Sequence, residues 1–168
     1  MRGINSDHVD DVRFHYSQLF CISRNPEKGQ VEIQVYDTRT WERICVIKSP
    51  CGCSHKYRHT LHVGSEYITI ACVNTNSIYT VTHQGDHVNN TKPGEFVYPY
   101  MCHNVSDAIL VADFSNHRLQ LQHAGEWSHV QLDHLPLWPR DAVYAGGALF
   151  VLSSYVAANQ RIIKYIPA

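Results

Sequence analysis

Hydrophobic and polar positions along the chain follow two patterns, and both are typical of β-strands. Residues 32–36 and 118–122 alternate polar and apolar side chains, as strands with one buried face do. Residues 108–112 and 149–152 are continuously apolar, as strands buried on both faces are. Helical periodicity is nearly absent. The sequence therefore predicts an all-β protein.

These strand patterns recur with a period of about 40 residues, which is typical of an array of β-sheet units. Each unit contains a continuously apolar strand, a turn, an alternating strand and a more polar outer strand, with a further strand before the apolar one. Four antiparallel strands per unit are typical of β-propeller blades. The approximate blades are residues 11–57, 58–100, 101–140 and 141–168, and the last ends after its third strand. We predict an incomplete β-propeller, with residues 1–168 forming one domain.

One blade carries a family resemblance. Residues 109–120 read Ile-Leu-Val-Ala-Asp-Phe-Ser-Asn-His-Arg-Leu-Gln, which resembles the core of the NHL repeat. Residues 139–143 resemble the proline-led start of the next such blade. Elsewhere the match is partial, because Cys72 and Ser153 stand where this blade has Asp113. The whole chain resembles a piece of the propeller that ends tripartite-motif proteins of invertebrate animals.

That resemblance implies protein or RNA binding on a propeller face. It implies no ligase activity, because the RING, B-box and coiled coil of those proteins are not in this sequence. Propellers of the family typically have six blades, whereas this sequence supplies four at most. We therefore expect either a fragment of a longer propeller or self-association that completes a ring.

Composition and charge limit the other function classes. Of the 168 residues, 44% are hydrophobic and 17% are charged, as in an ordinary globular domain. The net charge of −1 provides no long-range attraction to nucleic acid or to an anionic membrane. Because no stretch has the pattern of a signal peptide or a membrane span, we expect a cytoplasmic protein with reduced thiols and no membrane partner.

The candidate binding residues lie in turns and at blade junctions. A protein or peptide is expected to lie across the loop face and to contact Asn74, Asp113, Asn116, His117, Arg118 and Trp138. Tryptophan and arginine are enriched among residues that dominate binding energy. The alternative role is structural, because Asp and Asn in turns accept the backbone hydrogen bonds that hold the turn.

A second cluster of polar residues lies between the first two blades. Lys48, Lys56 and Arg58 form a small basic patch, and single-stranded RNA is therefore the alternative partner. The residue types that bind zinc also occur there, at Cys51, Cys53, His55 and His59. The Cys-x-Cys spacing, however, lacks the two-residue turn of a standard zinc knuckle. The sequence thus predicts no metal site and no cofactor.

An enzymatic role is the third alternative. Some propeller lactonases and lyases hold a metal ion with carboxylates, amides or histidines from several blades. The sequence contains no Gly-x-Ser-x-Gly elbow, glycine-rich phosphate loop or His-Glu-x-x-His motif. We predict that the chain is not an enzyme.

Overall fold

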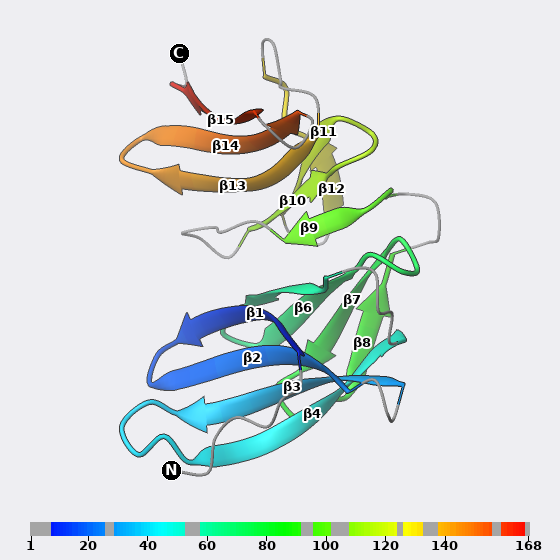
Figure 1. The fold of residues 1–168 in the computed structure, drawn as a ribbon, viewed down its shortest axis with the longest axis vertical. Coiled ribbons are helices and arrows are strands. Elements are labelled where there is room, and N and C mark those ends of the chain that lie inside the picture. Colours follow the sequence, from blue (N-terminus) through cyan, green and yellow to red (C-terminus); the bar gives the residue numbers. More distant parts are fainter. Residues whose placement is uncertain are drawn as a thin grey trace. The chain divides into compact units, whose positions relative to one another are not determined.

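The computed structural model describes residues 8–25, 29–52, 58–91, 96–101, 108–123, 126–132, 138–155 and 159–166. These ranges contain fifteen strands and no helix (Figure 1). The strands are β1 (His8–His15), β2 (Gln18–Asn25), β3 (Gln30–Asp37), β4 (Arg43–Gly52), β5 (Thr60–Val63), β6 (Tyr67–Cys72), β7 (Ser77–Thr82), β8 (His87–Asn90), β9 (Pro99–Met101), β10 (Ile109–Asp113), β11 (Arg118–His123), β12 (Glu126–His129), β13 (Pro139–Ala145), β14 (Ala148–Tyr155) and β15 (Asn159–Tyr165). The all-β prediction is confirmed.

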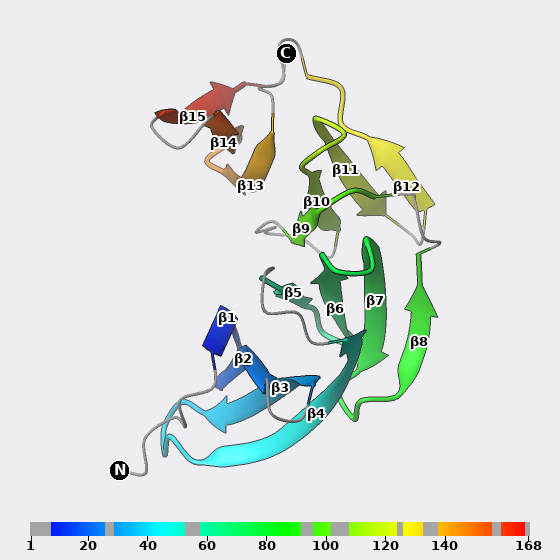
Figure 2. The ribbon, with the colours of Figure 1, turned by 45° about the vertical axis from the view of Figure 1, so that its right-hand side comes forward.

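The strands form four antiparallel sheets in which each strand pairs with its neighbour in sequence. Three sheets have four strands, β1 to β4, β5 to β8 and β9 to β12, and the last has the three strands β13 to β15. The chain divides into two compact units, unit 1 (Met1–Pro93) with the first two sheets and unit 2 (Gly94–Ala168) with the other two. Figure 2 shows the successive strands of each sheet side by side.

Unit 1 has a core of branched aliphatic side chains between its two sheets, because β2, β3 and β6 each turn apolar side chains inward. The buried members are Phe20, Ile22, Val31, Ile33, Val35, Ile47, Cys51, Leu61, Val63, Ile68, Ile70, Cys72 and Val81. Burying such side chains is the main favourable contribution to folding.

Two carboxylates of β1 bind the first strand of the next sheet. Asp10 Oδ2 accepts the backbone N–H of His59 at 3.0 Å, and Asp11 Oδ2 accepts that of Leu61 at 2.9 Å. The other oxygen of Asp10 pairs with Arg24 Nε at 2.9 Å. The edge of β5 is therefore hydrogen-bonded by side chains of β1 within unit 1.

Unit 2 has a smaller core between its two sheets. Its buried members are Leu110, Ala112, Leu119, Ala142, Leu149 and Val151. Half-buried side chains that include Tyr100, Leu121 and Tyr165 pack against this core. Throughout the described ranges, no helix is long and apolar enough to cross a membrane.

Candidate functional site

The turn after β10 is organised by the carboxylate of Asp113, which is 0% exposed. Its Oδ1 accepts the backbone N–H of Val97 at 2.8 Å. Its Oδ2 accepts Asn116 Nδ2 at 2.9 Å, Arg118 Nε at 2.7 Å and Gln120 Nε2 at 3.2 Å. Three of the predicted binding residues thus bond to one another and hold the turn in shape.

Aromatic rings and one arginine gather beside this turn, and we call Tyr100, Phe114, His117, Trp138 and Arg140 the Trp138 cluster. Phe114 and Trp138 stack with ring centroids 6.4 Å apart, and His117 lies 5.5 Å from Trp138. Tyr100 meets Phe114 edge to face at 6.1 Å, and Arg140 Cζ lies 5.5 Å from the centroid of Phe114. The four rings are half-buried and Arg140 is exposed, so part of each ring faces solvent.

The backbone holds Trp138 in an uncommon conformation. Its φ is 57°, in the left-handed region, although a proline follows and normally favours extended backbone at this position. Its N–H donates to Nδ1 of His117 at 3.0 Å, and His117 itself has a φ of 53°. Strained backbone of this kind persists only where the surroundings hold it, and such positions concentrate at functional sites.

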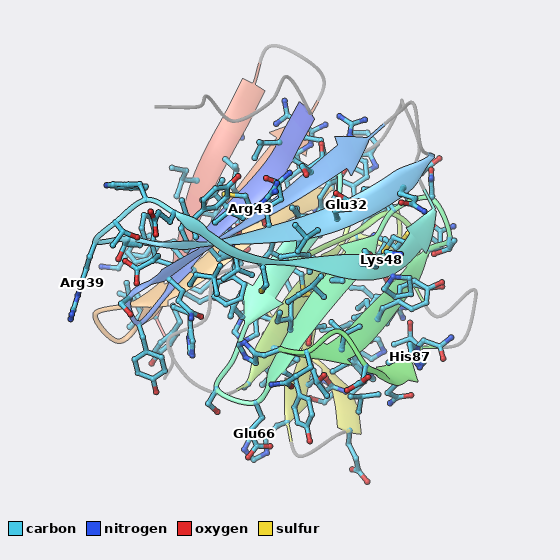
Figure 3. The ribbon with its side chains drawn as sticks, turned by 90° about the horizontal axis from the view of Figure 1, so that it is seen from below. Glu32, Arg39, Arg43, Lys48, Glu66 and His87 are labelled. Atoms are coloured by element: carbon cyan, nitrogen blue, oxygen red, sulfur yellow. The ribbon has the colours of Figure 1, made fainter. Side chains whose placement is uncertain are left out.

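The predicted residues of unit 1 have different surroundings. Asn74 is exposed, and its Nδ2 donates to the carbonyl of Gly52 at 3.3 Å. Lys48 is exposed on β4 and stands opposite Glu32 of β3, as Figure 3 shows. Arg58 is exposed before β5, and Lys56 lies outside the described residues. The acid opposite Lys48 weakens the positive potential that an RNA phosphate would meet.

A group of metal-ligating side chains lies inside unit 1, and we call Cys51, His59 and Cys72 the Cys–His cluster. Their ligand atoms all lie within 4.8 Å of one another, and all three side chains are buried. Cys51 comes from β4, His59 precedes β5 and Cys72 ends β6. The other two predicted candidates, Cys53 and His55, lie outside the described residues.

The two thiols of this cluster are electrostatically linked. A hydrogen bond from Cys51 lowers the pKa of Cys72 to about 4, against the effect of burial, and His59 and Thr75 add to the lowering. Burial raises the pKa of Cys51 well above its ordinary value, and the neighbouring Cys72 raises it further. The hydrogen bond between the two thiols therefore couples the loss of a proton from one to the protonation of the other.

Sequence reasoning missed several members of both groups. Cys72 is not among the predicted metal candidates, and the available signal was its position at the end of a buried strand, where another blade has Asp113. Phe114, Arg140 and Tyr100 belong to the Trp138 cluster, although only Trp138 and His117 were among the predicted binding residues. In the sequence, Phe114 directly follows Asp113, and Arg140 directly follows Pro139. Their contact in space, however, depends on the packing of β10 against β13.

The sheets and the comparisons with solved structures together define a class: the chain has the β-propeller fold. It is similar to a structural-genomics protein of unknown function from Bacteroides thetaiotaomicron. The two share 16% identity with a TM-score of 0.72, over 96% of this chain and 48% of that one. It is also similar to a catalytically inactive virginiamycin B lyase of Staphylococcus aureus with quinupristin, at 12% identity and a TM-score of 0.66, over 99% of this chain and 58% of that one.

A computationally designed protein, Ika4, covers the chain end to end. The two share 8% identity with a TM-score of 0.63, over 100% of this chain and 96% of that one. The chain thus spans about half the length of the two natural proteins and nearly all of the designed one. No protein-family model and no curated protein sequence matches it. At these identities the likeness shows the fold alone.

Proposed function

We propose that the chain is a non-catalytic binding module that recognises a segment of another protein through the Trp138 cluster. The observation that carries the proposal is the stack of half-exposed rings, Phe114 on Trp138, with the Arg140 guanidinium over Phe114. Aromatic and arginine side chains supply most of the energy at protein interfaces. The NHL-like sequence of residues 109–120 and the resulting resemblance support the same function and a cytoplasmic setting.

The chemistry of the cluster indicates what the bound segment contains. The exposed faces of Phe114 and Trp138 suit an aromatic or aliphatic side chain. A guanidinium that stacks on a ring keeps its N–H edge for a carboxylate, which it binds in a bidentate way. The proposed ligand is therefore an extended peptide in which an apolar residue lies next to Asp or Glu.

Selection from a displayed random-peptide library on the whole chain tests this proposal. We expect the enriched peptides to pair an apolar residue with an acidic one. Calorimetry on a selected peptide then compares variants. Trp138→Ala should weaken binding by about 30-fold, and Arg140→Ala and Arg140→Lys by about tenfold each, because lysine neither stacks nor binds in a bidentate way.

Trp41→Ala is the matched control, because Trp41 is also a tryptophan with positive φ, at 58°, but is 62% exposed and belongs to unit 1. Its substitution should leave the affinity unchanged. Peptides that bind equally well to Trp138→Ala would overturn the proposal. Binding of a single-stranded RNA oligonucleotide with a steep loss of affinity at higher salt would instead favour the RNA alternative.

A further inference from the structure

The Cys–His cluster has the ligand types of a site for a thiophilic metal ion. Zinc in proteins is bound by cysteine sulfur and histidine nitrogen, and such sites draw ligands from separate segments. Cys51, His59 and Cys72 come from the end of β4, the approach to β5 and the end of β6, which can be followed in Figure 2. An ion here would connect the two sheets of unit 1.

The burial of these side chains is the second observation. His59 is 0% exposed, and neither of its ring nitrogens makes a hydrogen bond of normal geometry in the described part of the chain, although the Cys72 thiol lies close to the ring. Buried polar atoms in native proteins nearly always have partners, and an exception indicates a bound water or ion or a functional role. A metal ion would occupy the lone pair of one of these nitrogens.

The spacing of the three ligand atoms suits zinc. With zinc–sulfur distances of about 2.3 Å, tetrahedral geometry places two sulfur atoms about 3.8 Å apart. The three ligand atoms lie within 4.8 Å of one another, which is about 1 Å more than this sulfur–sulfur distance. Small rotations of the side chains would bring the atoms to the distances that zinc needs.

We propose that Cys51, His59 and Cys72 bind a zinc ion inside unit 1, with a water molecule as its fourth ligand. Binding forms zinc–sulfur bonds to both cysteines and a zinc–nitrogen bond to His59. Both cysteines bind as thiolates, and each thiol proton displaced on binding goes to the solvent. The site goes beyond the proposed peptide-binding function and does not depend on it, because every ligand belongs to unit 1 and the Trp138 cluster belongs to unit 2.

The first test uses the unaltered chain, purified with a phosphine reductant and zinc and then freed of loose metal. Elemental analysis should find about one zinc ion per chain. Cobalt(II) added to the metal-free chain without oxygen should produce thiolate-to-cobalt charge-transfer absorption and the visible bands of a tetrahedral site. Zinc should also raise the thermal unfolding midpoint of the metal-free chain, because it binds the folded state.

Variants then locate the ion. Cys72→Ser should weaken zinc binding by about 100-fold or more and remove the cobalt charge-transfer band. Cys45→Ser replaces an exposed thiol and Cys21→Ser a buried one, and both should bind zinc as the unaltered chain does. Far-UV circular dichroism reports whether each variant is folded.

Three results would overturn the proposal. The first is an unaltered, folded chain that retains no zinc and gives no charge-transfer band. The second is zinc binding that is unchanged in folded Cys72→Ser. The third is a mass-spectrometric crosslink between Cys51 and Cys72 in the chain as it is isolated without reductant, together with no zinc, which would make the pair a disulfide.

Discussion

Cys72 and Asp113 occupy the same position in successive sheets. Each is the last residue of the second strand of its sheet, and each is 0% exposed. A four-residue turn follows both, and its last residue has positive φ, at Asn76 after Cys72 and at His117 after Asp113. The repeat therefore places a buried polar side chain at the end of the second strand in both sheets. Whether that side chain is a carboxylate or a thiol decides which groups it can bind.

The two sheets satisfy this position in different ways. Around Asp113, donors from the backbone of Val97 and from neighbouring side chains fill both carboxylate oxygens. Around Cys72, the neighbours are Cys51 and His59, and neither His59 nitrogen makes a hydrogen bond of normal geometry within the described ranges. All the acceptor positions used by Asp113 are thus filled by protein donors. The Cys–His cluster, in contrast, keeps sulfur and nitrogen atoms that can bind a metal ion.

The closed network predicts a large effect of Asp113→Asn. The amide keeps one acceptor oxygen but places an NH₂ group against donors and removes the charge that pairs with Arg118. We expect the free energy of unfolding to fall by about 2–4 kcal/mol. Urea unfolding followed by circular dichroism and tryptophan fluorescence measures it. Asp86→Asn, at an exposed turn, is the control and should change stability by less than about 0.5 kcal/mol; equal losses in the two variants would contradict the network.

The ion pair between Asp10 and Arg24 should show strong coupling. Its Oδ1–Nε distance is 2.9 Å, and the Asp10 side chain is only 1% exposed. Asp10→Asn removes the carboxylate partner of a largely buried guanidinium and should cost about 3–5 kcal/mol of unfolding free energy. Adding Arg24→Met removes the charge that the first change deprives of the Asp10 carboxylate, so the double variant should be less destabilised than the sum of the single ones.

A double-mutant cycle from urea unfolding measures this coupling, which we expect to be about 1–3 kcal/mol. The matched control cycle combines Asp10→Asn with Arg39→Met instead of Arg24→Met. Arg39 is an exposed arginine of the same unit. That cycle should be additive. Coupling of the same size in both cycles would show that the Asp10–Arg24 contact contributes nothing specific.

Much of the fold was predictable because strand periodicity reports which face of a strand is buried. The alternating segments 32–36 and 118–122 lie within β3 (Gln30–Asp37) and β11 (Arg118–His123). The apolar run 108–112 overlaps β10, whose last four residues are all buried. Local sequence suffices here, because alternation and turn residues act over a few positions.

The candidate sites were less predictable, because they depend on contacts between strands that are distant in sequence. Cys51 and Cys72 are on different sheets, and only the packing of those sheets brings their sulfur atoms near His59. The sequence directed attention to the adjacent Cys51 and Cys53 instead. Trp138 was predicted from its place at a blade junction, but its stacking partner Phe114 lies in the turn after β10 of the preceding sheet.

The imidazoles of His15 and His83 should make unit 1 sensitive to acid. Their ring centroids are 6.1 Å apart, and burial together with the charge of His83 lowers the pKa of His15 below 6.5. As the pH falls below about 6.5, the unfolded chain takes up a proton at His15 before the folded chain does, so this group lowers stability.

Unfolding midpoints in urea, measured from pH 7.5 down to pH 5, test this effect. The variant His83→Gln keeps a donor for the Gly64 carbonyl, which His83 Nε2 contacts at 3.0 Å, but removes the second imidazolium. Its stability should decline less steeply with falling pH than that of the unaltered chain. Parallel curves would show that repulsion between the two rings is negligible.

Gly85 should tolerate a side chain poorly. It has a φ of 93° in the turn between β7 and β8, and an added Cβ would lie 3.1 Å from Cγ2 of the buried Ile47. Gly29 has a φ of 61°, and no described atom lies within 4 Å of its Cβ position. Gly29→Ala should therefore cost about 1 kcal/mol of unfolding free energy from the left-handed backbone alone.

Gly85→Ala should cost about 2–3 kcal/mol, because the contact with Ile47 adds to a larger backbone strain. Urea unfolding of the two alanine variants gives both costs under the same conditions. A double-mutant cycle of Gly85→Ala with Ile47→Ala separates the two contributions, since alanine removes the Cγ2 atom that the added Cβ would meet. We expect Gly85→Ala to cost about 1 kcal/mol less in the Ile47→Ala background, and equal costs in both backgrounds would show that the contact with Ile47 contributes nothing.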